Sequence, residues 1–179
     1  KTAVGGALAS LLQTSLIEGD EYHPRANIVK LQRGLPLVDE DRWPWIAHVA
    51  GAMRSHFARC EQSRRQDRKA EAPVVPVDAD PLAEFPFALA TCSTMRRQHR
   101  DYLVNQTGEP VLFVELSAAR ELIRLRIRER EDHYQASLNL DSQLAMLEPI
   151  QPDELGIVVD ASLSLDEVVN TIRSRLQPT

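Results

Sequence analysis

The sequence predicts an α/β fold in which helices cover both faces of a parallel sheet. Short, continuously apolar segments recur at 15–18, 85–91, 111–116 and 156–160, which is typical of strands buried on both faces. Segments with apolar residues at helical spacing lie between them, so strands and helices alternate along the chain. The 179 residues have the length of one domain, and we therefore expect a single domain over 1–179.

The first third of the chain is expected to be mostly helical. Apolar residues at helical spacing predict a helix over 3–13, and a short strand follows at 15–18. Proline at the first position favours a helix over 24–32, and Gly34 supplies its stop signal. A long helix with one apolar side is predicted over 39–59.

Residues 61–84 change character and interrupt the alternation. The segment is first charged and then rich in proline, with no apolar period. Such a composition is typical of a surface loop that builds no core of its own. We therefore expect an insertion loop at 61–84.

The second half of the chain is expected to repeat a strand followed by a helix three times. Ser93 and Ser117 are predicted to cap helices that end near residues 105 and 131. Ser164 and Glu167 have the spacing of a capping box, and the last helix follows them with one apolar face.

Composition and charge exclude several classes of protein. Hydrophobic residues make up 43% and charged residues 26%, so the chain is neither wholly disordered nor a fibrous repeat. The net charge of −5 argues against a nucleic-acid reader. Arginine accounts for 18 of the 21 basic residues, and its planar fork suits carboxylates and phosphates. A biased genome composition would produce the same excess.

The two cysteines, Cys60 and Cys92, lie in dissimilar contexts and do not form a disulfide framework. A reducing compartment, and hence the cytoplasm, is the expected location. No apolar run approaches the roughly 18 residues that a membrane span needs, so no membrane association is expected.

Arginines crowd the helix that follows the third strand. Arg120, Arg124 and Arg128 recur every four residues, which predicts a solvated stripe. Arg126 and Arg130 fall on the mostly apolar side, where an arginine is costly unless it is paired. Their partner is either a core acid or an anionic ligand, and we favour the ligand.

Polar residues follow the strands at the edge where ligands bind to parallel sheets. Residues 18–23 bring acids and a histidine after the first strand, and residues 92–97 bring arginines after the second. Acids and arginines together suit a site that binds an anion and moves a proton or a phosphoryl group. Lys1 and Thr2, just before an apolar helix, would end a phosphate-binding loop of the form G-x-x-x-x-G-K-[ST] if residues ahead of them supplied the glycines.

The segment 19–45 contains a long and specific motif. It meets every fixed position of GD-x-x-HP-x-x-N-x-x-K-x-x-x-G-x-PL-x-D-x-DR-x-PW. Further matches at 92–103 follow CSALK-x-x-YRD-x-L in part, and others lie at 133–134, 142–143 and 147–148. The chain thereby resembles the gluconokinase family of P-loop small-molecule kinases, which is related to shikimate and nucleoside-monophosphate kinases.

Some positions depart from that family. Thr94-Met95-Arg96 replaces Ala-Leu-Lys, Asp132 stands where a lid glycine is usual, and Ala136 where lysine or proline is common. The lid departures bear on its flexibility and its phosphate contacts, but not on the fold. The resemblance also implies that a first strand and a glycine-rich loop lie immediately upstream of Lys1.

The resemblance implies an ATP-dependent kinase that phosphorylates the 6-hydroxyl of D-gluconate. Its product, 6-phosphogluconate, would feed the pentose phosphate pathway. ATP and Mg²⁺ are the expected cofactors, gluconate is the expected substrate, and a homodimer is the expected assembly. A substrate-binding helical part is expected at about 20–60 and a mobile lid at about 130–142.

The family assigns the phosphate and metal roles to residues at the strand ends. Lys1 would contact the β- and γ-phosphates, and Thr2 would hold Mg²⁺ through its hydroxyl. Asp20 would accept or orient the proton of the attacking hydroxyl, the alternative being a cap for the next helix. Glu18 would position Mg²⁺ through water, or is merely solvated.

The family also implies the groups that recognise the sugar acid. Arg42 would grip the carboxylate, the alternative being a salt bridge to Asp39 or Asp41. His23 would bond substrate hydroxyls or be structural, and His133 would reach the sugar acid or lie on the surface.

The remaining roles fall to arginines and tryptophans. One of Arg96 and Arg97 would face the substrate or phosphate, and Arg97 is assigned this role. Arg126 and Arg130 would clamp the ATP phosphates, with Arg130 among the catalytic groups. Trp43 and Trp45 are expected to pack in the core.

Two other functions remain open. The same fold would serve a kinase for another sugar acid or a polyol. If no phosphate-binding loop precedes Lys1, the domain would instead be a non-catalytic binding module.

Overall fold

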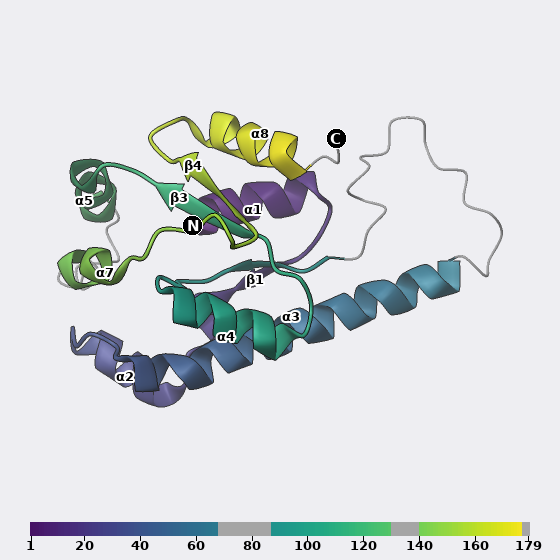
Figure 1. Ribbon diagram of the computed structural model, residues 1–179, viewed down its shortest axis with the longest axis horizontal. Coiled ribbons are helices and arrows are strands. Elements are labelled where there is room, and N and C mark those ends of the chain that lie inside the picture. The colour runs from purple at the N-terminus through teal and green to yellow at the C-terminus, as the bar shows by residue number, and fades with distance from the viewer. Residues whose placement is uncertain (68–86, 130–139, 177–179) are drawn as a thin grey trace.

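The computed structural model describes residues 1–67, 87–129 and 140–176, and it confirms the α/β fold (Figure 1). In chain order the elements are α1 (Thr2–Leu11), β1 (Leu16–Glu18), the 3₁₀ helix η1 (Gly19–Tyr22), α2 (Arg25–Gln32), α3 (Asp39–Asp67), β2 (Leu89–Thr91), α4 (Arg97–Thr107), β3 (Phe113–Ser117), α5 (Arg120–Arg128), α7 (Leu140–Met146), β4 (Gly156–Asp160) and α8 (Leu165–Leu176). Strands and helices alternate as predicted.

The four strands pair in parallel, as expected, and form two separate ladders. β1 pairs with β2, so that Glu18 lies opposite Thr91. β3 pairs with β4, so that Ser117 lies opposite Asp160. Within the described residues no hydrogen-bonded ladder joins the two pairs. Each of the four strands leads at its carboxyl end into a loop or a helix. The candidate site residues lie in these segments.

Helices cover the strands on two sides, which confirms the predicted layers. α1 and α8 lie on one side, and α3 and α4 lie on the other (Figure 1). The first core is built around the buried side chains of Leu8, Val168 and Ile172. The second is built around Trp45 and Val49, which are at most 1% exposed. Burying such side chains supplies most of the stability of each layer.

The predicted boundary between the long helix and the insertion loop is wrong. α3 runs to Asp67 rather than ending near residue 59, so the first part of 61–84 is helical. Five of the eight added residues, at 60–67, are glutamate, glutamine or arginine, which are good helix formers. Arg65 and Glu61 also form an i,i+4 ion pair of 3.5 Å. The rest of the predicted insertion lies outside the described residues.

Helix α8 begins with the predicted capping box. The backbone N–H of Ser164 donates to Glu167 Oε2 at 3.0 Å, and the N–H of Glu167 donates to Ser164 Oγ at 3.3 Å. The caps predicted at Ser93 and Ser117 are wrong. α4 begins later, at Arg97, and Ser117 is the last residue of β3.

The stop signal predicted at Gly34 is confirmed. Gly34 follows α2 with a φ of 70°, a left-handed conformation that glycine adopts without strain. Along the described part of the chain, no helix combines the length and the apolar character that crossing a membrane requires.

Candidate active site

The carboxyl ends of β1 and β2 form the floor of the candidate site. Glu18 and Thr91 end the two strands side by side, and the Thr91 hydroxyl donates a hydrogen bond to Glu18 Oε1. A Cβ added to Gly19 would overlap the backbone carbonyl oxygen of Thr91. Only glycine therefore lets the chain turn so closely against β2 before Asp20. Glu18 is thus bonded to its neighbouring strand, and the alternative that it is merely solvated is wrong.

Three side chains from different segments converge above this floor. Lys1 Nζ donates to Ser93 Oγ at 2.6 Å and lies 3.8 Å from Asp20 Oδ1. The Asp20 side chain is 60% exposed, so a ligand can reach its carboxylate. No side chain caps η1 or α2, which excludes the alternative that Asp20 serves as a cap. Thr2 is exposed and is the first residue of α1, next to Lys1.

His23 is held against this cluster by the core. Its ring stacks on Trp45 with centroids 4.4 Å apart and planes at 17°. Trp45 packs in the core, as predicted, and its Nε1–H donates to the Gly19 carbonyl at 2.7 Å. Burial lowers the pKa of His23, Asp20 opposes this shift, and the charge of Arg42 lowers the pKa further. A neutral imidazole at neutral pH can donate and accept hydrogen bonds at once.

Arg42 is a buried cation with no ion pair to the nearby acids. Only 5% of the residue is exposed, and its Nε finds no hydrogen-bond partner among the residues that the structure describes. Burial lowers the pKa of Arg42, and the charge of Asp39 opposes that shift. The alternative that Arg42 forms a salt bridge to Asp39 or Asp41 is therefore wrong within the described chain.

Asp41 is turned away from Arg42 by its own partners. Lys30 Nζ lies 2.6 and 2.7 Å from its two carboxylate oxygens, and the backbone N–H of Val38 donates to it at 3.0 Å. The Lys30 hydrogen bond holds the pKa of Asp41 below its usual range. Asn27 adds a hydrogen bond from its amide to the Asp41 carbonyl at 2.7 Å.

Asp39 is likewise bound by other residues. Arg96 Nη1 and Gln98 Nε2 donate to Oδ2 at 2.7 and 2.8 Å, and His99 Nε2 lies 3.0 Å from Oδ1. Burial opposes ionisation of Asp39, but the His99 hydrogen bond and the Arg96 charge outweigh it and lower the pKa. The Arg96 charge also lowers the pKa of Arg42, so the two guanidinium charges repel each other.

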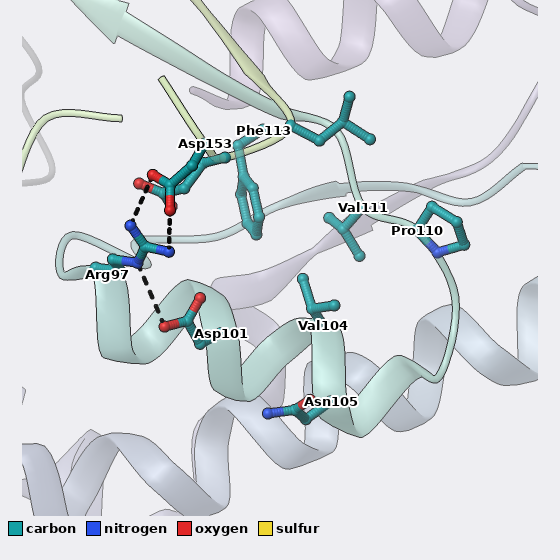
Figure 2. Close-up of a pocket in the computed structure, with 10 residues that line it drawn as sticks. Arg97, Asp101, Val104, Asn105, Pro110, Val111, Phe113 and Asp153 are labelled. Atoms are coloured by element: carbon teal, nitrogen blue, oxygen red, sulfur yellow. Dashed lines mark hydrogen bonds and ion pairs between the residues drawn. The ribbon is translucent and has the colours of Figure 1, made fainter. Parts of the chain in front are cut away.

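The adjacent arginines Arg96 and Arg97 pair with different acids. Arg97 lies between Asp153, at 2.8 Å, and Asp101, at 3.6 Å (Figure 2). These residues line one end of an open groove of about 530 Å³, whose apolar wall includes Val104 and Phe113. The pairs do not support the predicted substrate contact of Arg97. Of the two arginines, Arg96 is the one whose charge lowers the pKa of Arg42.

The arginines at 120, 124 and 128 of α5 are exposed, which confirms the predicted solvated stripe. Arg120 and Arg124 also pair with Asp141 on α7, at 2.6 and 2.9 Å. Arg126 is exposed rather than inward, and it donates to the Ala161 carbonyl at 2.6 Å. That carbonyl follows the carboxyl end of β4. Arg130 and His133 lie outside the described residues.

Four residues near the site had no predicted role in it: Cys92, Ser93, Asp39 and His99. Burial raises the pKa of the Cys92 thiol to about 12, although the charge of Lys1 opposes this shift. The thiol is therefore protonated and unreactive near pH 7. The motif contains Cys-Ser and a fixed aspartate, so it carried a signal for three of these residues. His99 gave none, because only the tertiary structure brings it to Asp39.

The geometry supplies two cations that could bind anionic groups, and an accessible carboxylate lies beside one of them. Lys1 offers an exposed cation, Arg42 offers a buried one, and Asp20 lies within reach of the first. A molecule with a carboxylate at one end and a hydroxyl at the other would suit this arrangement if the hydroxyl faced Asp20. Such a site can bind an anion and transfer a phosphoryl group near Lys1.

Comparison with known proteins supplies relatives over nearly the whole chain. No family model matches it. The thermosensitive gluconokinase of Escherichia coli is 31% identical over 175 residues, which cover 97% of this chain and 79% of that protein. A gluconokinase structure from Sinorhizobium meliloti matches with a TM-score of 0.71 and 29% identity, over 98% of this chain and 85% of the other. An unliganded sugar kinase from a Janibacter species matches with a TM-score of 0.68 and 32% identity, over 97% and 85%.

Proposed function

Because this chain belongs to the gluconokinase family, we propose that it transfers the γ-phosphoryl group of ATP to the 6-hydroxyl of D-gluconate. The products are 6-phosphogluconate and ADP, and the first would enter the pentose phosphate pathway. The observation that carries the proposal is Arg42, a buried guanidinium without a carboxylate partner in the described chain. A buried cation of this kind is suited to the carboxylate of an aldonate.

The sugar acid binds between Arg42 and Asp20. The gluconate carboxylate takes the unpaired guanidinium of Arg42, and a fork-to-fork contact would fix its orientation. His23, stacked on Trp45, is placed to bond a hydroxyl of the sugar chain. The 6-hydroxyl, at the far end from the carboxylate, then faces the exposed carboxylate of Asp20.

The transfer itself needs positioning and charge neutralisation more than covalent chemistry. The 6-oxygen forms a bond to the γ-phosphorus while the bond from that phosphorus to the β–γ bridging oxygen breaks. ADP leaves with the bonding electron pair, and Asp20 accepts or orients the hydroxyl proton. Lys1 gives up its contact with Ser93 and neutralises the β- and γ-phosphates.

The donor set near Lys1 fits Mg²⁺. Thr2 offers a hydroxyl and Glu18 and Asp20 offer carboxylates, which are the oxygen ligands this cation prefers. Within the described residues no three acidic, histidine or cysteine side chains form a metal cluster, as is usual when Mg²⁺ is held largely by phosphates and water. When bound, Mg²⁺ would neutralise charge on the phosphates.

The other predicted roles belong to the same proposal. In this proposal Arg126, which donates to the Ala161 carbonyl after β4, serves the ATP side of the site together with Arg130. His133 keeps its predicted contact with the sugar acid, whereas Arg97, which pairs with Asp153 and Asp101, is left out of the proposed site. The homodimer and the cytoplasmic location also remain proposals, and the free thiols of both cysteines fit a reducing compartment.

The test is a coupled ADP-release assay on the natural protein, including whatever sequence precedes Lys1. We expect turnover with gluconate and little with shikimate, nucleoside monophosphates, other sugar acids or polyols. Asp20→Asn should lower kcat by about 10²- to 10⁴-fold, whereas Asp166→Asn, an exposed acid on α8, should leave it unchanged. Absence of gluconate-dependent ADP would contradict the proposal, and preference for another acceptor would reassign the substrate.

A further inference from the structure

Arg42 has no ion-pair partner among the described residues, although an acid lies close to it on the same helix. Asp39 and Arg42 are three residues apart at the start of α3, a spacing at which side chains of a helix can pair. The Asp39 charge is felt at Arg42, yet the two form no ion pair within 4 Å. Something must therefore hold Asp39 away from Arg42.

The start of α4 supplies that restraint. Both carboxylate oxygens of Asp39 are occupied, Oδ2 by Arg96 and Gln98 and Oδ1 by His99. Arg96 and Gln98 are partly exposed, so water can compete with their hydrogen bonds. His99 is 0% exposed, and its contact with Asp39 is shielded from water. His99 is thus the most strongly fixed of the three donors.

Among the described residues, the His99 ring has one hydrogen-bond partner, Asp39. Trp43 contacts the ring edge-on with centroids 5.2 Å apart. The second ring nitrogen, Nδ1, is buried and has no hydrogen-bond partner among the residues described. Burial lowers the pKa of His99, so the ring is neutral near pH 7 and its Nε2–H donates to Asp39. The family pattern has tyrosine at this position, where this chain has His99.

We propose that His99 is a positioning residue that holds Asp39 against α4 and so keeps the Arg42 guanidinium free for the substrate carboxylate. This rests on the proposed function, because it assigns the gluconate carboxylate to Arg42. Without His99, Asp39 Oδ1 loses its shielded donor. Arg42, three residues further along α3, has no carboxylate partner among the described residues. The resulting ion pair would compete directly with the substrate.

The central variant is His99→Leu in the natural protein. We expect its KM for gluconate to rise about tenfold while the KM for ATP and kcat at saturating gluconate change little, because competition affects only the carboxylate site. Asp39→Asn in the same background should restore the gluconate KM, since a neutral amide does not form an ion pair with Arg42. His99→Tyr should stay near wild type, because a phenol can donate to Asp39.

Controls separate positioning from folding. His56→Leu alters another buried histidine, outside the site, and should leave both KM values unchanged. If His99→Leu does not fold by circular dichroism, Gln98→Ala removes an exposed donor from Asp39 and should raise only the gluconate KM. Equal changes in both KM values, or no rescue by Asp39→Asn, would overturn the inference. Wild-type protein without gluconate turnover would instead contradict the proposed function.

Discussion

Replacing Arg42 by methionine should stabilise the unliganded protein while it weakens gluconate binding. Arg42 is 5% exposed and its Nε has no partner in the described chain. A buried polar group without a partner raises the free energy of the folded state, and methionine of similar length removes it without leaving a large cavity. The same change removes the proposed contact with the substrate carboxylate.

The size of both effects follows from the contacts. An unsatisfied buried group costs about 1–3 kcal/mol, and the attraction of the nearby Asp39 and Asp41 offsets part of it. We therefore expect a gain of about 1–2 kcal/mol in the free energy of unfolding, or a rise in Tm of roughly 2–8 °C for a chain of this size. Loss of a charged hydrogen bond worth about 1.5–3 kcal/mol should raise the gluconate KM roughly 10- to 150-fold.

Arg100 provides a matched control because it is a buried arginine with a full set of partners. It is 3% exposed and bonds Glu154 at 2.5 and 2.8 Å, with the Glu148 carbonyl at 3.0 Å. Arg100→Met would leave the buried Glu154 carboxylate uncompensated. We therefore expect it to lose about 3–5 kcal/mol of stability, the opposite sign from Arg42→Met.

The measurements are urea unfolding of the unliganded variants and steady-state kinetics with gluconate and ATP varied in turn. In wild type, added gluconate should raise the unfolding midpoint by mass action, and in Arg42→Met this shift should shrink. The reasoning would be refuted if Arg42→Met destabilised the protein as much as Arg100→Met. It would also be refuted if both substrates showed equal changes in KM.

Two further predictions concern the strand ends and pH. Gly19→Ala places a Cβ against the Thr91 carbonyl, so it should cost about 1–3 kcal/mol of stability and reduce kcat; a variant with wild-type Tm and turnover would contradict this. Burial lowers the pKa of His56 below 6.5, so the unfolded chain binds more protons and stability should fall as pH drops below about 6.5. His56→Gln should make that fall shallower by up to about 1.4 kcal/mol per pH unit in urea unfolding; parallel curves for the two proteins would count against it.

Local pattern was enough to predict most of the elements. Apolar strands at 15–18 and 156–160 and the box at Ser164 and Glu167 depend on residues near in sequence, and the structure has all of them. The caps predicted at Ser93 and Ser117 were wrong because a helix N-terminus can be capped by a residue that is distant in the sequence. The backbone N–H of Arg97 is capped by the Glu148 carboxylate at 2.8 Å, a partner far along the chain.

The candidate site divides in the same way. Residue types predicted that the polar residues after the first two strands would share one edge, because parallel strands bring their carboxyl ends together. In the structure Lys1 contacts one residue of each group, Asp20 and Ser93. Only the tertiary structure decided which charges stay unpaired. Asp39 lies close to Arg42 along α3, but donors from α4 hold it, and so the buried guanidinium is left for a ligand. Pairing depends on distances between elements that no local pattern contains.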